Sequence, residues 1–234
     1  LASDLSVNAL VNAADAKLSL NGGVAKIIAD RAGPALPREC VKVLQGLEKA
    51  NRPFGTGQCA LTPGFALESS GVEWIAHAVA PMYRQSVLSL DSDYKATVQS
   101  ALDKVNAAAC TALAIPLLGS GVCQWPQDHA ATLMADGVVE WYRRRARRGL
   151  STRLQRIVFI DVDPAKGRAL AAALLKHCCP GAHDAAGVAP REAVSTATAQ
   201  PMRADARSME RLFFPPSAAP PAAEAAAAAI PTAV

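Results

Sequence analysis

The stretch ALAIPLLGSGVCQWP (residues 112–126) sets the structural pattern of the chain. Its first seven residues form an apolar run short enough to be a buried strand. A glycine-rich turn follows at residues 119–121, and Pro126 opens a helix that we expect to reach about residue 148, because proline favours the first helical position. A buried strand, a turn of small residues and a helix in this order are typical of a parallel sheet covered by helices.

The same alternation of short strands and longer helices extends from residue 7 to residue 177. The hydrophobic periodicity predicts strands over residues 7–11, 59–62, 72–79, 112–118 and 157–162, and helices over residues 23–32, 36–49, 91–109, 126–148 and 165–177. Strands separated by helices indicate an α/β fold with a largely parallel sheet and helices on both of its faces. In such folds ligands bind outside the carboxyl ends of the strands.

Composition divides the chain in two. Residues 1–179 have the pattern of a folded domain, whereas 27 of the 55 residues from 180 to 234 are alanine or proline. Such a segment has few large apolar side chains to offset the entropy of ordering, so we expect a disordered tail.

Charge, cysteines and hydropathy exclude several classes of protein. There is no run of about 18 apolar residues and no secretory signal pattern, so we expect no membrane span and a cytoplasmic or nuclear location. The six cysteines form no C-x-x-C pair and have no matching histidine spacing, which argues against a zinc or redox site. The formal charge of +4 is too small to indicate nucleic-acid binding by itself, and we expect no nucleic-acid partner.

Two loops of small residues carry the chemistry. The first follows the strand at residues 7–11 and contains Asn12-Ala13-Ala14-Asp15 and then Asn21-Gly22-Gly23-Val24, and the second is Gly119-Ser120-Gly121-Val122. Small side chains let backbone amides approach a ligand, and the N-terminus of a helix presents unpaired N–H groups to an anion. Two such loops are suited to the two phosphates of one ligand, although neither a P-loop nor a Rossmann fingerprint occurs.

These segments, in this order, resemble the macro domain, an ADP-ribose-binding module. The resemblance rests on VNAAD (11–15), NGGVAKIIADRAGPAL (21–36), WIAHAVAP (74–81), PLLGSGVCQWPQDHAA (116–131) and VFIDVD (158–163). It covers about residues 1–178 and in character is nearest to the macro-histone and macro-PARP branches. The family implies a three-layer α/β/α sandwich on a six-stranded mixed sheet, with ADP-ribose lying across the strand ends.

The resemblance also implies a ligand site that needs no metal or cofactor. Backbone groups near Gly22 would bind the diphosphate and distal ribose, the second loop would close over the phosphates, and adenine would rest near Val162, with Phe159 the nearest aromatic side chain. The implied ligand-binding residues are Asn12, Ala13, Asp15, Gly22, Gly23, Val24, Gly119, Ser120, Gly121, Val122, Cys123 and Val162.

The chain departs from the family pattern at several of these positions. Asp15 replaces the usual asparagine, which keeps an acceptor for a ribose hydroxyl, removes an amide donor and adds negative charge near two phosphates. Cys123 and Gln124 stand where an aromatic residue and a glycine are common, and Ala25 stands where some hydrolytic members carry an aspartate. The family's first strand and its adenine-reading aspartate would fall at or before Leu1, so we expect that strand to be missing.

The favoured function is recognition of ADP-ribose, free or as a terminal mono-ADP-ribosyl unit on a protein, by a monomer. One alternative is an ADP-ribosylhydrolase or O-acetyl-ADP-ribose deacetylase in which Asp15 orients a water. Another is a degenerate scaffold that binds no ligand.

Four further features have a structural and a functional interpretation. We expect His77 to be a core histidine bonded to backbone rather than a catalyst, and His129 to be an exposed side chain. Trp125 either flanks the ligand or packs under the second loop. The run RRRARR at residues 143–148 is first a solvated helix end and second a nuclear-localisation or phosphate-binding patch.

Overall fold

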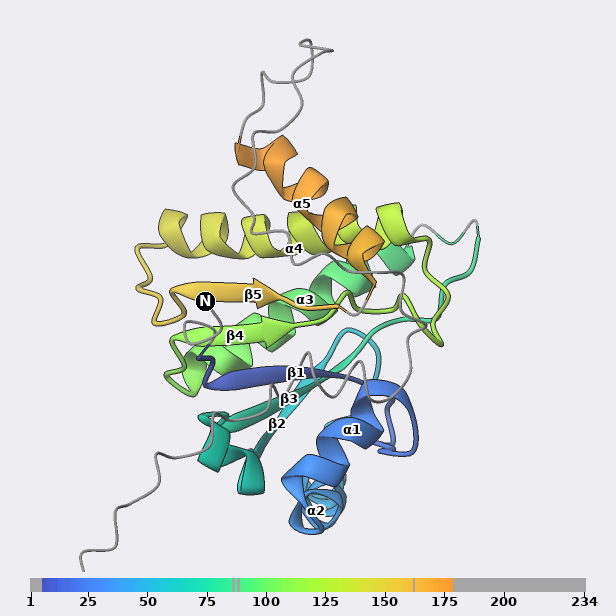
Figure 1. Ribbon diagram of the computed structural model, residues 1–234, viewed down its shortest axis with the longest axis vertical. Coiled ribbons are helices and arrows are strands. Elements are labelled where there is room, and N and C mark those ends of the chain that lie inside the picture. Colours follow the sequence, from blue (N-terminus) through green and yellow to red (C-terminus); the bar gives the residue numbers. More distant parts are fainter. Residues whose placement is uncertain (1–5, 86, 88, 162, 179–234) are drawn as a thin grey trace, which may run out of the picture.

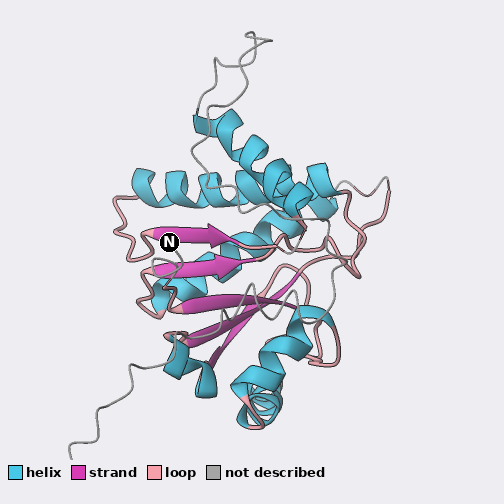
Figure 2. Ribbon diagram, viewed as in Figure 1, coloured by secondary structure: helices cyan, strands magenta, loops and turns pink. Residues whose placement is uncertain are grey.

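A computed structural model describes residues 6–85, 87, 89–161 and 163–178 of the chain. In this part of the chain one sheet of five strands, in the order β2-β3-β1-β4-β5, lies between two layers of helices (Figure 1). Helices α1 and α2 cover one face, and α3, α4 and α5 lie on the other (Figure 2). The predicted three-layer α/β/α sandwich is therefore confirmed, with five strands among the described residues rather than six.

The sheet is mixed and largely parallel, as predicted. Its strands are β1 (Ala9–Ala14), β2 (Cys59–Pro63), β3 (Trp74–Val79), β4 (Ala112–Ile115) and β5 (Arg156–Phe159). Strand β1 pairs in parallel with β3 and β4, and β4 pairs in parallel with β5. Only β2 is antiparallel, against β3, because a short connection through the 3-10 helix η1 (Phe65–Ser70) joins the two strands.

The helices are α1 (Gly23–Ala32), α2 (Ala35–Lys49), α3 (Ser89–Ala107), α4 (Gln127–Arg147) and α5 (Pro164–Cys178). Each overlaps its predicted range closely. The strand predictions over residues 112–118 and 157–162 extend too far. Strand β4 ends at Ile115 because the next residue, Pro116, has no N–H to continue the ladder, and β5 ends at Phe159. Pro126 precedes the first helical residue of α4 instead of occupying it.

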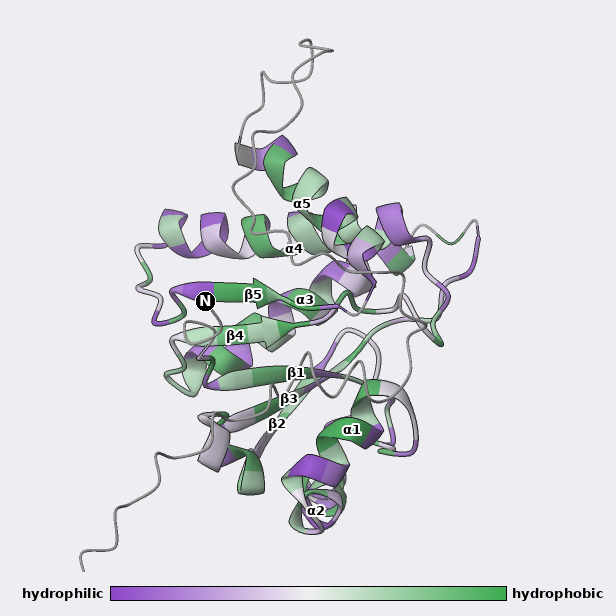
Figure 3. Cartoon of the chain, viewed as in Figure 1, coloured by the Kyte–Doolittle hydropathy of each residue, from purple (hydrophilic) through white to green (hydrophobic). Residues whose placement is uncertain are grey.

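Two hydrophobic cores hold the layers together. Neighbouring residues of β1 alternate between them, with Leu10 facing α1 and α2 and Val11 facing α3, α4 and α5. Ile28 and Leu36 fill the first core, and Trp141 is among the fully buried side chains of the second. Most of the strand length is accordingly green or pale green on the hydropathy scale, whereas the start of β5 is purple (Figure 3).

Two predictions concern other regions of the chain. No helix in the described ranges is both long enough and apolar enough to cross a bilayer. The predicted tail, residues 180–234, lies outside the described residues.

Candidate functional site

Both glycine-rich loops lie at the same edge of the sheet. The first loop (residues 15–22) follows β1 and the second loop (residues 116–126) follows β4. Because β1 and β4 are neighbouring parallel strands, their carboxyl ends point the same way (Figure 1). This is the edge at which α/β proteins bind ligands, and the topology places both loops there.

Asp15 closes the first loop on itself. One of its carboxylate oxygens, Oδ1, accepts the N–H groups of Lys17 at 2.9 Å and Ser19 at 3.0 Å. Between them Leu18 adopts a positive φ of 50° and buries its side chain in the core beside α1 and α2. Partial burial raises the pKa of Asp15, but the hydrogen bonds from Ser19 and Lys17 outweigh that effect and lower the pKa overall. Asp15 is therefore an ionised acceptor that shapes the loop.

The beginning of α1 presents unpaired amides. Gly22 is extended and Gly23 has a positive φ of 55°, which glycine adopts at little cost. Lys26 donates the first helical N–H, to Gly22, so the amides of Gly23, Val24 and Ala25 precede the helical ladder. A Cβ atom at Gly22 or Gly23 would meet nothing within 4 Å. This end of α1 is thus open and suited to an anion.

Aromatic packing fixes the base of the second loop. Gly119 has a φ of 73°, and a Cβ there would lie 2.7 Å from Cδ1 of Trp125. The Trp125 side chain is only 4% exposed and donates its indole N–H to the carbonyl of Pro81 at 2.7 Å. Tyr94 packs against it with ring centroids 4.8 Å apart and donates its hydroxyl to the carbonyl of Leu118. Of the two interpretations of Trp125, the structure shows packing under the loop.

The tip of the second loop is exposed and small. The Ser120 hydroxyl donates to a carbonyl of the same loop at 2.9 Å, which leaves its backbone as the part free to meet a ligand. A Cβ at Gly121 would meet nothing within 4 Å, and Val122 is 87% exposed. The Cys123 thiol faces the carbonyl of Ala80 at 3.8 Å, and burial raises its pKa, so it remains a neutral thiol.

The Asn12 side chain is buried in the core. It lies between β1 and the layer of α1 and α2, where the amide donates to Nδ1 of His77 at 3.1 Å. The other ring nitrogen of His77 lies 3.0 Å from the hydroxyl of Thr62 and 3.9 Å from the thiol of Cys40. Burial lowers the pKa of His77 to about 4. Asn12 therefore serves the packing of β1 against β3 and is not exposed for the predicted ligand contact.

His77 is a neutral core residue, as expected, but its partners are side chains and not the predicted backbone groups. The sequence does not predict Thr62 or Cys40 as partners of His77. Thr62 is a buried residue of β2, next to the partly buried Leu61. Strand pairing between distant segments sets these positions: Thr62 lies opposite Ile75, and Asn12 lies opposite His77. His129 is half-buried rather than exposed, and its ring lies 3.1 Å from the Asp91 carboxylate.

The predicted adenine position, Val162, lies outside the described residues. On either side of it, Asp161 accepts the N–H of Asp163 at 3.1 Å and pairs with Lys166 at 3.4 Å. The Phe159 side chain packs into the core on the side of α3, α4 and α5. Phe159 is therefore directed to the core and not to the carboxyl edge of the sheet, where adenine is predicted to bind.

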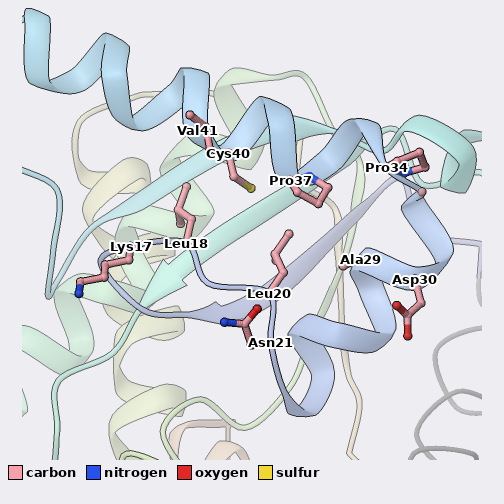
Figure 4. A pocket seen from close by; sticks show the side chains of 11 residues that line it. Lys17, Leu18, Leu20, Asn21, Ala29, Asp30, Pro34, Pro37, Cys40 and Val41 are labelled. Atoms are coloured by element: carbon pink, nitrogen blue, oxygen red, sulfur yellow. The ribbon is translucent and has the colours of Figure 1, made fainter.

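A cavity of about 570 Å³ lies beside the first loop (Figure 4). Leu18, Leu20 and Pro37 line it together with Cys40, and no residue of the second loop takes part. Burial and the neighbouring charge of Glu39 raise the pKa of the Cys40 thiol to about 11, so this cysteine is not a nucleophile at neutral pH. The cavity therefore lies between the first loop and helices α1 and α2.

Comparison with known proteins identifies the same pattern. The family model described as Macro domain matches residues 11–134. The chain is 31% identical over 160 residues to the mouse protein named ADP-ribose glycohydrolase MACROD2, covering 68% of this chain and 31% of that protein. It is 32% identical over 142 residues to a Shigella flexneri protein named O-acetyl-ADP-ribose deacetylase, covering 61% of this chain and 76% of that protein.

Solved structures show the same fold. The Oceanobacillus iheyensis macrodomain with ADP matches with a TM-score of 0.62 at 22% identity, covering 74% of this chain and 85% of that one. The chain spans less than half the length of some relatives, including 42% of a Mycobacterium tuberculosis protein to which it is 35% identical over 170 residues.

Proposed function

The chain belongs to the macro domain family, and on that premise we propose that it binds ADP-ribose, free or as the terminal mono-ADP-ribosyl unit of a modified protein. The observation that carries the proposal is the pair of open amide loops at one edge of the sheet. The amides of Gly23 and Val24 begin a helix, and Gly121 and Val122 are exposed on the loop that follows the neighbouring strand. The first loop supplies donors and a positive helical end to a diphosphate, and the second loop supplies backbone donors.

Small residues keep the space over these amides open. The glycines at positions 22, 23 and 121 have no atom within 4 Å of the place where a side chain would begin. The second loop is held from below by the rings of Trp125 and Tyr94, so its amides are ordered before a ligand arrives. Preorganised donors bind more tightly because less entropy is lost on association.

Within this site Asp15 is better suited to binding than to catalysis. Its lowered pKa makes it a weak base, and one of its oxygens already accepts two backbone N–H groups. Ala25 is apolar and buried, so it supplies no acid or base at the position where hydrolytic members carry an aspartate. These observations support a reader of ADP-ribose.

A hydrolase is the second candidate, and two relatives favour it by the activities in their names. The mouse relative is named as a glycohydrolase and the Shigella relative as a deacetylase. Incubation of the chain with a mono-ADP-ribosylated protein separates the candidates. A reader leaves the modification in place, whereas release that is lost in Asp15→Ala supports the hydrolase.

Calorimetric titration with ADP-ribose, ADP and AMP tests the proposed binding. We expect ADP-ribose to bind at least about tenfold more tightly than AMP, because AMP lacks the second phosphate and the distal ribose. Gly121→Val fills the open space of the second loop and should weaken ADP-ribose binding at least about tenfold. The matched control is Gly55→Val, since a Cβ at Gly55 also meets nothing within 4 Å.

Two results contradict the proposal. If ADP-ribose binds no more tightly than AMP, the site makes no favourable contact with the second phosphate and the distal ribose. Absence of any binding or thermal shift supports the non-binding scaffold instead.

A further inference from the structure

Positive charge is concentrated in one segment of the chain. Residues 141–160 contain no lysine, aspartate or glutamate but seven arginines, which are Arg143, Arg144, Arg145, Arg147, Arg148, Arg153 and Arg156. The formal charge of the whole chain is +4, so the other residues together carry −3. The segment comprises the end of α4, the loop at residues 148–155 and β5. The net charge of the chain therefore conceals a strongly basic surface.

Two of the arginines hold the end of α4 in place. Arg144 donates to the side-chain oxygen of Gln99 at 2.6 Å and to the Asp103 carboxylate at 3.2 Å. Arg145 donates to the carbonyl of Ser151, and its guanidinium lies 5.1 Å from the ring centroid of Trp141. These contacts are structural, and they bind the following loop to the helix.

Four other arginines form what we call the arginine surface: Arg143, Arg147, Arg148 and Arg153. All four side chains are exposed, and none has a side-chain hydrogen bond or ion pair with the residues that the structure describes. Two carboxylates on α3 and α4, Asp103 and Glu140, are already paired, with Arg144 and Lys95 respectively. The positive charge of the arginine surface is therefore not neutralised within the described domain.

The loop that carries part of this surface is well anchored. The side-chain oxygen of Asn106 accepts the Thr152 hydroxyl at 2.9 Å and the backbone N–H of Arg153 at 2.8 Å. Tyr142 donates its hydroxyl to the carbonyl of Leu154 at 3.0 Å. The backbone that presents the arginines is thus ordered, which limits the entropy lost when an anion binds.

The arginine surface lies away from the two amide loops. Helix α4 starts after the second loop and runs back to the amino end of β5, so its last turn is at the opposite edge of the sheet (Figure 1). In Figure 3 the end of α4 shows purple and the start of β5 is purple, on the side away from the strand arrowheads. A ligand on the arginine surface therefore does not compete with one at the amide loops.

We propose that the arginine surface binds the phosphate backbone of duplex nucleic acid without reading its sequence. The planar guanidinium group donates two parallel hydrogen bonds to a phosphate, and four such groups on an ordered surface suit a polyanion. The nearby aromatic rings are not available for stacking on bases, because Trp141 is buried and Tyr142 is held by Leu154. Without a stacking platform a duplex backbone fits better than a single strand.

The net charge of the whole chain predicts no nucleic-acid partner. That net charge combines the basic residues 141–160 with the other residues, which are slightly acidic. The proposal also differs from the hypothesis of a nuclear-localisation signal. Residues 143–147 are helical, and Arg144 and Arg145 are engaged in the fold, so the run is not presented as an extended peptide. The proposal does not depend on ADP-ribose binding.

Fluorescence anisotropy with a labelled DNA duplex of about 20 base pairs tests the proposal on the full chain. We expect binding at 50 mM NaCl that weakens steeply by 200 mM, since each phosphate contact contributes about 0.9 to the salt slope. The triple variant Arg143→Gln, Arg147→Gln, Arg148→Gln should bind at least about tenfold more weakly, with a salt slope smaller by about 2 to 3. The matched control Arg38→Gln, Lys49→Gln, Arg52→Gln removes the same charge from exposed positions on and after α2 and should lose less than about threefold.

Four outcomes overturn the proposal. The first is no binding at 50 mM NaCl, and the second is an equal loss of affinity in the two triple variants. The third is that polyglutamate displaces the labelled duplex as effectively as unlabelled DNA of equal total charge. The fourth is that saturating ADP-ribose displaces the duplex. The third outcome indicates an acidic protein as partner. The fourth indicates that the duplex occupies the amide loops. Circular dichroism of each variant confirms that the fold is retained.

Discussion

The two loops at the carboxyl edge of the sheet are supported by different physical means. A polar group supports the first loop, because the Asp15 carboxylate accepts two of its backbone N–H groups. Aromatic rings support the second, through Trp125 and its contacts with Tyr94 and Tyr83. The first loop therefore depends on a charged side chain, whereas the second depends on aromatic packing.

Glycines that support the fold of the loops differ from glycines that are open to contact a ligand. Gly119 is enclosed by the rings beneath the second loop, whereas Gly22, Gly23 and Gly121 face open space. Substitution of the enclosed glycine should act on the free energy of unfolding. Substitution of the open ones should act on ligand affinity, and the predictions below test that division.

Trp125→Ala should give the largest effect. It removes a buried ring and its hydrogen bond to Pro81, and we expect the free energy of unfolding to fall by about 3 to 5 kcal/mol. Trp125→Phe keeps a ring and should lose less. Urea unfolding followed by circular dichroism measures both, and a loss below about 1 kcal/mol for Trp125→Ala contradicts aromatic support of the second loop.

Acidification should weaken the buried polar contact of Asn12 with His77, which packs β1 against β3. Burial lowers the folded-state pKa of His77 from 6.5 to about 4, so between these pH values the unfolded chain binds a proton that the folded chain does not. The stabilisation is full above pH 6.5 and is lost as the pH falls toward 4, by about 3 kcal/mol in all.

Unfolding free energies of the wild type and His77→Gln at several pH values test this sign. The variant should lose the decline that begins just below pH 6.5, while carboxylates still contribute near pH 4. The prediction is wrong if the two proteins show the same slope between pH 6.5 and 5.

Gly119→Ala should destabilise the chain by about 2 kcal/mol, because the added Cβ meets the Trp125 ring at 2.7 Å and the φ of 73° disfavours alanine. The control is Gly46→Ala in α2, where a Cβ meets nothing within 4 Å and alanine should stabilise the helix by up to about 1 kcal/mol. Equal unfolding midpoints for the two variants contradict the enclosure of Gly119.

Gly22→Val should weaken ADP-ribose binding about tenfold, or about 1.4 kcal/mol, and leave stability nearly unchanged. Gly22 is extended with a φ of −161°, which valine adopts readily, and nothing occupies the space beside it. Calorimetry and thermal unfolding of this variant and of Gly55→Val measure the two effects. A large loss of stability with unchanged affinity shows that Gly22 supports the fold and does not contact the ligand.

Asp15→Asn should have the smallest effect, a gain of about threefold in ADP-ribose affinity. An asparagine oxygen still accepts the N–H groups of Lys17 and Ser19, while a negative charge near the diphosphate is removed. Calorimetry at low and high salt checks this, because an electrostatic gain shrinks as salt rises. Weaker binding by the variant shows that the carboxylate itself contacts the ligand.

Sequence reasoning succeeds here where the signal is local. The bounds of α1 are those predicted, because Gly22 and Gly23 open the helix and Gly33 ends it with a φ of 84°. The sandwich and the position of both glycine-rich loops follow from the alternation of strands and helices along the chain. Local turn chemistry and periodicity carry that information.

Sequence reasoning is less informative where distant strands decide the outcome. The burial of Asn12 and its contact with His77 depend on the register of β1 with β3. Likewise, the place of Trp125 beneath its own loop depends on Pro81 and Tyr94, from separate parts of the chain. Neither arrangement has a short-range signature, which is why these side chains could not be assigned before the fold was known.

Backbone amide shifts followed by NMR during titration with ADP-ribose test the central claim most directly. If both loops grip one diphosphate, the amides of Gly23 and Val24 and those of Gly121 and Val122 shift together with one midpoint. The amides of Arg147 and Arg148 stay unchanged. Movement of one loop alone, or of the two loops with different midpoints, contradicts a shared diphosphate.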